Sequence, residues 1–403
     1  MKRGCKVRWR CSNMSNDTQP EIRFPGFTEA WEQRKLSELA TINARIGWQN
    51  LRTSEFLDNG DYMLITGTDF KDGAIDYSNI HYVEKERFEQ DKKIQISNGS
   101  ILITKDGTLG KVAYVEGLTM PATLNAGVFN VRVKEDLAID SRYLFHYLKA
   151  PFLLKFADQR STGGTIKHLN QNVLVEFPIP LPSLEEQHKV ARLLSNFDNV
   201  LALHQRKLDL LKETKKGFLQ KMFPKNGAKV PEIRFPGFTG DWEDREFSEI
   251  VKTTGYKAYL SEAFEVGEYP VIQQGDKPIL GYSDKKPFEN FEDVVLFGDH
   301  TLSLYKPETP FLVATDGLKI ITVPNFSGSF LLSLLEKYVP ESQGYKRHFT
   351  ILKKEQVAFP TDVKERVLIG EFFTQIDRTI TLHERELDLL KETKKGFLQK
   401  MFV

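Results

Sequence analysis

Two long stretches of the chain, residues 183–223 and 361–403, repeat apolar side chains in alternating steps of four and three. This heptad pattern predicts two helices, each with an apolar seam that a partner helix must cover. The apolar seam residues are Phe197, Leu201, Leu208, Leu211, Phe218 and Met222 in the first stretch, and Ile376, Ile380, Leu387, Leu390, Phe397 and Met401 in the second. The same series of steps also includes the polar residues His204 and Lys215 in the first stretch, and His383 and Lys394 in the second. Because a whole domain separates the two stretches, we expect an antiparallel coiled coil.

The remaining sequence alternates short apolar runs with turns that contain Gly or Asp, which is typical of strands. The clearest strands are expected at Tyr62–Thr66, Ser100–Thr104, Val112–Val115, Val128–Val133, Tyr269–Ile272, Val294–Phe297, Phe311–Ala314 and Lys319–Val323. Helical spacing recurs at Arg142–Lys149, where Pro151 would interrupt or restart the helix, and near Phe330–Tyr338. We therefore predict two α/β (α+β) domains separated by the two long helices.

The chain is a duplicated half with a pseudo-twofold internal repeat. LDLLKETKKGFLQKMF occurs at Leu208–Phe223 and again, unchanged, at Leu387–Phe402, and PEIRFPGFT occurs at Pro20–Thr28 and Pro231–Thr239. Between these copies the sequence diverges. The repeated segments would suit a partner that binds the chain twice, and the divergent segments would suit two different targets. The predicted divisions are an extension at 1–19, a first domain at 20–182, a helix at 183–223, a linker at 224–230, a second domain at 231–360 and a helix at 361–403.

Composition limits the classes of function. A chain of 403 residues with 40% apolar residues can form two or three domains with sizeable cores. The formal net charge of +1 gives no overall basic signal for nucleic acid, so a DNA-binding surface would have to come from local clustering. This near-neutral charge counts weakly against binding to DNA.

The first residues give no sign of export. Cys5 and Cys11 are the only cysteines, which excludes a disulfide framework and fits a reducing cytoplasm. Residues 1–13 are basic but lack the apolar stretch of a signal peptide, and no run approaches the about 18 apolar residues of a membrane span. We interpret residues 1–13 as an upstream extension or a mis-assigned start before Met14, and expect residues 1–19 to be disordered; the alternative is a basic arm that contacts phosphate.

Catalytic motifs are absent from the sequence. GTLGK at Gly107–Lys111 lacks the spacing of a phosphate-binding loop, and Val112 stands where Ser or Thr would be required. No HExxH or GxSxG motif and no methyltransferase loop is present. We therefore predict that this chain is not an enzyme by itself and binds no cofactor.

Polar loops carry the candidate contacts to nucleic acid. Loops at 163–168 and 344–348 each place a Gly, then a cation and a His, before the last strand of their domain. Cations and amide groups on loops suit phosphate and base-edge contacts, although a plain solvated loop is the alternative. The candidate DNA-binding residues are Lys105, Thr108, Lys111, Thr165, Lys167, His168, Gln273, Gln274, Lys277, Thr301, Tyr345, Lys346, Arg347 and His348.

His204 and His383 occupy equivalent seam positions in the two helices. Two histidines that face each other across a seam are potential metal ligands. A polar seam residue that fixes the helix register is the commoner case. The sequence alone therefore favours a structural role and predicts no metal.

The chain resembles the specificity subunits of type I restriction–modification enzymes. The resemblance rests on Pro180–Phe223, on its shorter C-terminal copy and on the opening RFPGFTEAWEQRKLSEL. QQGDKPILGY at Gln273–Tyr282, FGDHT at Phe297–Thr301 and GYKRH at Gly344–His348 also resemble one class of target recognition domain. The resemblance covers nearly all of the chain after residue 19.

This resemblance implies that this chain recognises DNA and that partner subunits carry out the reactions. Each variable block would be a target recognition domain that reads one half of a split site in double-stranded DNA, and the coiled coil would space the two domains. Two modification subunits would bind S-adenosylmethionine and methylate adenine, and two restriction subunits that use ATP and Mg would join where they exist.

Two other functions compete with this one. A coiled-coil adaptor with two protein-binding heads would fit the near-neutral charge, but it leaves the recurrent Gly–cation–His loops unexplained. A self-sufficient methyltransferase is the weakest alternative because no cofactor motif is visible.

Overall fold

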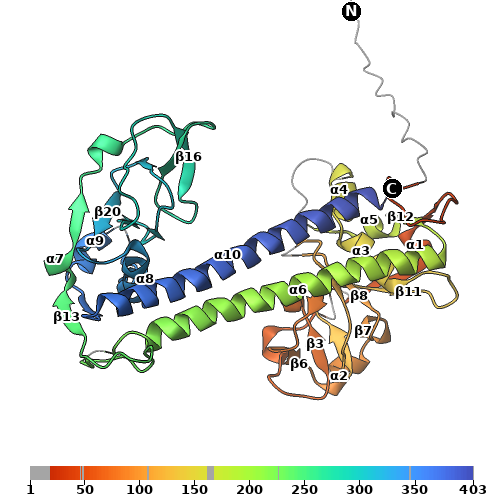
Figure 1. The fold of residues 1–403 in the computed structure, drawn as a ribbon. Coiled ribbons are helices and arrows are strands. Elements are labelled where there is room, and N and C mark those ends of the chain that lie inside the picture. The colour runs from red at the N-terminus through yellow and green to blue at the C-terminus, as the bar shows by residue number, and fades with distance from the viewer. Residues whose placement is uncertain are drawn as a thin grey trace, which may run out of the picture. The chain divides into compact units, whose positions relative to one another are not determined.

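The computed structural model describes residues 19–45, 47, 50–106, 109–160, 168–225, 227–344 and 346–402. The chain divides into two compact units (Figure 1). Unit 1 comprises Met1–Ala202 with Asp388–Val403, and unit 2 comprises Leu203–Leu387. Each unit therefore contains one globular domain and part of each long helix. The extension predicted at residues 1–19 lies outside the described residues except for Gln19.

The domain of unit 1 is built on two four-stranded sheets. The first has the order β2-β11-β8-β9 and is antiparallel, and the second has the order β6-β3-β10-β7 with a parallel pair, β3 and β10. The strands of this unit are β1 (Glu32–Lys35), β2 (Ala40–Ala44), β3 (Met63–Ile65), β4 (Phe70–Lys71), β5 (Ala74–Ile75), β6 (His81–Tyr82), β7 (Gln95–Ile96), β8 (Ile101–Thr104), β9 (Val112–Tyr114), β10 (Ala122–Leu124), β11 (Val128–Val133) and β12 (Pro178–Leu181).

The helices of unit 1 are α1 (Leu36–Leu39), α2 (Lys85–Glu89), α3 (Ser141–Lys149), α4 (Phe152–Gln159) and α5 (Gln171–Val175). Helices α1, α3 and α5 pack against the first sheet, whereas the Phe88 ring of α2 stacks on Tyr62, next to β3 of the second sheet. Helix α3 begins where the Asp140 carboxylate accepts a hydrogen bond from the Tyr143 backbone N–H at 2.8 Å, which satisfies one of the unpaired amides of the first turn. Its buried face, including Tyr143 and Leu144, joins the main core of the unit.

The domain of unit 2 repeats this plan with a different sequence. Its antiparallel sheet has the order β14-β20-β17-β18, and its second sheet, β16-β15-β19, again has a parallel pair, β15 and β19. The strands are β13 (Glu243–Glu246), β14 (Lys252–Thr254), β15 (Tyr269–Ile272), β16 (Ile279–Ser283), β17 (Val295–Gly298), β18 (Leu304–Tyr305), β19 (Leu312–Val313), β20 (Leu318–Thr322) and β21 (Gln356–Phe359), and the short helices are α7 (Phe247–Ile250), α8 (Gly328–Tyr338) and α9 (His348–Leu352). The prediction of two α/β domains is confirmed.

The two long helices are α6 (Leu184–Lys221) and α10 (Val363–Lys400). In unit 1, the beginning of α6 packs on the end of α10, with the Phe197 and Phe397 rings 5.4 Å apart. In unit 2, the end of α6 packs on the beginning of α10, with the Phe218 and Phe372 rings 5.0 Å apart. The helices are therefore antiparallel in both units. Among the described helices, none is long and apolar enough to cross a membrane.

Not every seam residue of the repeat is apolar. In unit 1, Lys394 on α10 pairs with Asp198 on α6 at 2.5 Å, and in unit 2, Lys215 on α6 pairs with Asp377 on α10 at 2.6 Å. The two lysines are equivalent positions of the repeat, and so are the two aspartates. Each pair joins the antiparallel helices at one position within its unit, and this explains why both copies keep the same polar residues.

A second repeated ion pair attaches each opening segment to its long helix. The Arg23 guanidinium donates to both carboxylate oxygens of Glu186 at 2.7 and 2.8 Å, and Arg234 does the same to Glu365 at 2.6 and 2.8 Å. Glu186 is 1% exposed and Glu365 is 0% exposed. Two parallel hydrogen bonds between a guanidinium and a carboxylate are among the strongest in proteins, so the repeated PEIRFPGFT segment has a structural role.

Removing one partner of this pair is expected to destabilise only one unit. Arg23→Ala leaves the buried Glu186 carboxylate without its cation, and we expect it to lower the free energy of unfolding of unit 1 by about 3 kcal/mol. Arg234→Ala should have the same effect on unit 2. Denaturant unfolding, monitored by hydrogen exchange in each unit separately, measures this change in the free energy of unfolding.

The control for this experiment is Arg34→Ala. Arg34 also pairs with a glutamate, Glu38, but both side chains are exposed, so stability should change little. An equal loss of stability in Arg34→Ala and Arg23→Ala would contradict a special role for the buried pair.

Candidate nucleic-acid interface

Loops of unit 2 meet where strand β17 ends. The amide oxygen of Gln274, in the loop after β15, accepts a hydrogen bond from the His300 backbone N–H at 3.3 Å. The backbone N–H of Gly275 donates to the Ser303 hydroxyl at 2.9 Å. Gly317 permits this approach, because a Cβ at that position would lie 2.7 Å from the Gln274 side-chain nitrogen. The loops at residues 273–278 and 299–303 therefore form one surface.

His348 joins a third loop to this surface. It is 0% exposed, and its Nδ1 lies 3.0 Å from the carbonyl oxygen of Asp299. Its Nε2 accepts a hydrogen bond from the Gln343 backbone N–H at 3.0 Å, so the ring proton resides on Nδ1 and is donated to Asp299. Both ring nitrogens are used within the protein. His348 is thus a structural residue and not a base-reading one, in contrast to the role predicted for it.

The residues beside His348 remain accessible. Lys346 and Arg347 are exposed, and the Lys346 ammonium donates a hydrogen bond to the side chain of Gln343 at 3.0 Å. Two exposed cations on a loop that a buried histidine holds in place are chemically suited to contact phosphate or a base edge. We call the residues 273–278, 299–303, 343–344 and 346–348 the loop cluster of unit 2.

Unit 1 has a corresponding cluster at the end of β8. Gly67, in the turn after β3, lies so close to β8 that a Cβ there would be 2.9 Å from the Thr104 methyl carbon. The Asp106 carboxylate, just beyond β8, lies 2.5 Å from Nδ1 of the exposed His168. We call residues 66–69, 104–106, 109–111 and 168 the loop cluster of unit 1. In each domain a histidine therefore contacts the loop that follows an inner strand of the antiparallel sheet, β8 for His168 and β17 for His348. Of these two histidines, His168 is exposed and His348 is buried.

The other predicted contacts fall in or beside these clusters. Lys111 is exposed, and the Lys105 ammonium lies 5.7 Å from the centre of the Phe129 ring. In unit 2, Lys277 and Thr301 are exposed, while the Gln273 side chain donates to the Lys277 carbonyl at 3.0 Å. The remaining predicted contacts lie outside the described residues, namely Thr108, Thr165, Lys167 and Tyr345.

Sequence reasoning missed the turn that follows β3. Thr66 begins this turn, and its backbone N–H donates to the Asp69 carboxylate at 2.7 Å. Burial raises the pKa of Asp69, and the hydrogen bonds from Thr66 oppose this effect. Thr68 is exposed at the tip. The sequence could have indicated this turn by its position. The turn follows β3, which belongs to the parallel pair of its domain, just as Gln273 and Gln274 follow β15 in the parallel pair of the other domain.

Two domains of one fold, each presenting polar loops of different sequence, define an internally duplicated recognition protein. A family model described as the type I restriction modification DNA specificity domain matches residues 28–213 and 239–392. The chain belongs to this family and is a type I restriction–modification specificity subunit with two target recognition domains.

Known relatives agree with this assignment. The chain is 26% identical over 402 residues to the putative type I restriction enzyme MjaX specificity subunit of Methanocaldococcus jannaschii, covering 92% of each protein. It is 24% identical over 246 residues to the MjaVIII specificity subunit of the same organism, covering 58% of this chain and 56% of the relative. The crystal structure of the S subunit from M. genitalium shares the fold, with a TM-score of 0.66 at 16% identity over 96% of this chain and 99% of that one.

Proposed function

We propose that each target recognition domain reads one half of a bipartite, gapped site in double-stranded DNA through its loop cluster. The observation that carries the proposal is that the two domains share one plan, a four-stranded antiparallel sheet beside a smaller sheet with a parallel pair, yet present different side chains on the corresponding loops. Lys111 and His168 face outward in unit 1, whereas Lys277, Lys346 and Arg347 do so in unit 2. Different donors at equivalent loops fit two unlike half-sites.

The long helices would serve as a spacer and as a docking surface for two modification subunits. Each helix exposes two leucines that are seven residues apart, which are Leu203 (64%) and Leu210 (67%) on α6 and Leu382 (56%) and Leu389 (69%) on α10. These leucines occupy equivalent positions of the repeat. Exposed apolar side chains that occur at equivalent positions of two repeated helices suit two copies of one partner.

This chain would itself be non-catalytic. S-adenosylmethionine for adenine methylation would bind to the modification subunits, and ATP and Mg to restriction subunits, where these are present. With a net charge of +1, the chain would leave much of the phosphate contact, and its salt dependence, to its partners.

Single-molecule methylation sequencing tests this function. The chain is co-expressed with its modification subunit and compared with a strain from which only this chain is deleted. We expect one split, adenine-methylated motif that disappears in the deletion. If no motif depends on this chain while the modification subunit is bound and active, the two-headed protein adaptor replaces the DNA reader.

A further inference from the structure

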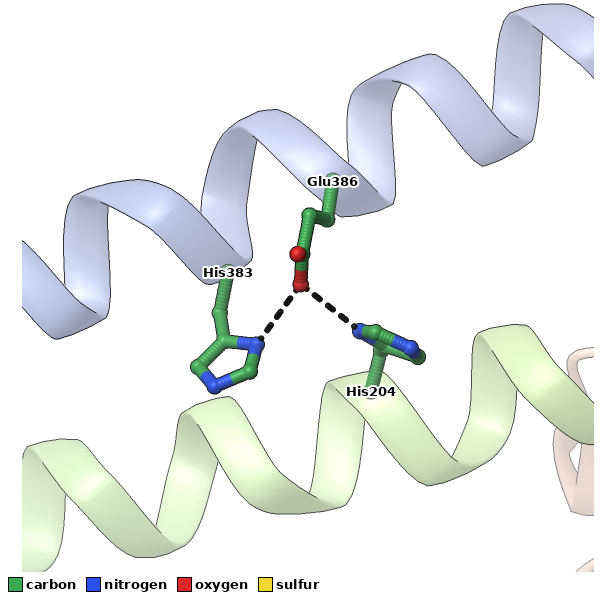
Figure 2. A group of neighbouring side chains, drawn as sticks. All are labelled: His204, His383 and Glu386. Carbon is green, nitrogen blue, oxygen red and sulfur yellow. Dashed lines mark hydrogen bonds and ion pairs between the residues drawn. The ribbon is translucent and has the colours of Figure 1, made fainter.

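Three potential metal ligands meet between the long helices in unit 2. His204 comes from α6, and His383 and Glu386 come from α10, where a spacing of three residues puts them on one face. One ligand atom of each residue lies within 4.8 Å of the others. Figure 2 shows one carboxylate oxygen of Glu386 facing both imidazole rings.

Both distances from the Glu386 carboxylate fit a single metal ion. Glu386 Oε2 lies 3.1 Å from His383 Nδ1 and 3.4 Å from His204 Nδ1. Ligand atoms about 2.0–2.1 Å from a tetrahedral Zn²⁺ are separated from each other by about 3.4 Å. We propose that His204, His383 and Glu386 bind one divalent transition-metal ion, with Zn²⁺ as the representative, and that this ion links α6 to α10 within unit 2.

Hydrogen bonding alone leaves part of this cluster unsatisfied. His204 Nδ1 is buried and forms no hydrogen bond with any described residue, although it lies within ion-pair distance of Glu386. His383 is only 7% exposed. Unpaired buried polar atoms are rare in proteins, so such an atom calls for an explanation. A metal ion would accept the lone pairs of both imidazoles and of the carboxylate at once.

The site breaks the pseudo-twofold symmetry of the chain. His204 and His383 are the same position in the two copies, and antiparallel packing brings them together, with ring centres 5.7 Å apart. The residue equivalent to Glu386 in the first copy is Lys207, which cannot be a ligand. The two described helices therefore offer one such site, and the expected stoichiometry is one ion per chain.

The donor set indicates the class of metal. Imidazole nitrogen suits Zn²⁺, Ni²⁺ and Cu²⁺, and a single carboxylate is compatible with all three. Three protein ligands leave one tetrahedral position for water. The ion would join residues from two separate segments, as a structural metal does, and would stabilise the pairing of the helices.

Metal titration of the full chain tests the site. The background variant is Cys5→Ser/Cys11→Ser, which removes the only two thiols and with them the main competing Zn²⁺ ligands. The chain, co-purified with its modification subunit if it needs that partner, is stripped with a chelator and titrated with Zn²⁺ against a chromophoric competitor. We expect one bound Zn²⁺ per chain in excess of that bound by the modification subunit alone, and a rise in the unfolding midpoint of unit 2.

Single substitutions decide whether these residues bind the ion. Affinity should fall at least tenfold in His204→Gln, His383→Gln and Glu386→Gln, because even outer-shell partners of metal ligands contribute about 10- to 100-fold. Glu384→Gln is the matched control, since Glu384 lies on the same helix but pairs with the exposed Lys212. Co²⁺ should give a tetrahedral absorption spectrum with the parent chain and lose it with His383→Gln.

Two outcomes would overturn the proposal. One is the absence of Zn²⁺ binding by a chain whose circular dichroism shows intact helices, which would leave the three residues as a register-fixing polar cluster. The other is equal affinity in the parent and in the His204→Gln and His383→Gln variants, which would place the ion elsewhere. Neither outcome bears on DNA reading, because the ligands lie outside both loop clusters.

Discussion

Exchange of residues 242–360 for the corresponding segment of another specificity subunit should replace one half of the methylated motif and leave the other half unchanged. The segment includes the whole loop cluster of unit 2, from Gln273 to His348, and none of unit 1. A wrong base pair in a recognised site costs about 1–3 kcal/mol, so several altered contacts are enough to move methylation entirely to a new half-site. Single-molecule methylation sequencing of the host carrying the chimera measures this.

The boundaries of the exchange follow the structure. They keep the Arg234–Glu365 pair and helix α10, and they retain Phe223 and Phe373, which pack against the core of the domain. The control is the unexchanged chain with the exposed residues Lys346 and Arg347 replaced by alanine, and its original half-site should be methylated less without a change of sequence. A change in both halves of the motif, or in neither, would contradict one domain reading one half-site.

The sequence predicted the regular elements well, where a local pattern specifies the structure. The heptads predicted helices at 183–223 and 361–403, and the structure has α6 at Leu184–Lys221 and α10 at Val363–Lys400. The strand expected at Val128–Val133 is β11, with the same bounds. Pro151 restarts a helix after α3, as expected, because proline is well tolerated at a helix start.

Most strands of two residues escaped prediction, although β19 lies within the strand expected at Phe311–Ala314. Strands β6 and β18 have only two residues each, too few for an alternating pattern. Their conformation depends on pairing with distant partners, as β6 pairs with β3. No window of sequence contains that information.

The roles of single polar residues could be predicted least. The sequence located the loop at 344–348, yet His348 is buried because it hydrogen-bonds to Asp299, far away in the chain. Glu386 was not singled out, because its proximity to His204 arises only when the antiparallel helices pack. Residue type and spacing therefore identified the loops, and the long-range contacts determined which side chains stay free.

Leu208→Asp and Leu387→Asp should each disrupt the helix pairing of unit 2. Leu208 is 5% exposed and Leu387 is 3% exposed. Replacing a buried leucine removes its packing, which alone costs about 2–5 kcal/mol, and the carboxylate adds the cost of burying an unpaired charge. We expect each variant to lose at least about 3 kcal/mol of stability, to fail to co-purify with the modification subunit and to lose methylation in the cell. Denaturant unfolding and co-purification measure the first two effects.

Exposed leucines of the same helices separate folding from docking. Leu210 and Leu389 are 67% and 69% exposed, so Leu210→Asp and Leu389→Asp should leave the unfolding free energy almost unchanged. If these leucines contact the modification subunits, the same two variants should still weaken co-purification. If Leu208→Asp and Leu387→Asp kept both stability and methylation, this would contradict the role of these leucines in pairing the two helices. Weak docking by a stable Leu210→Asp variant would instead assign Leu210 to the partner surface, because the helix pair itself would be intact.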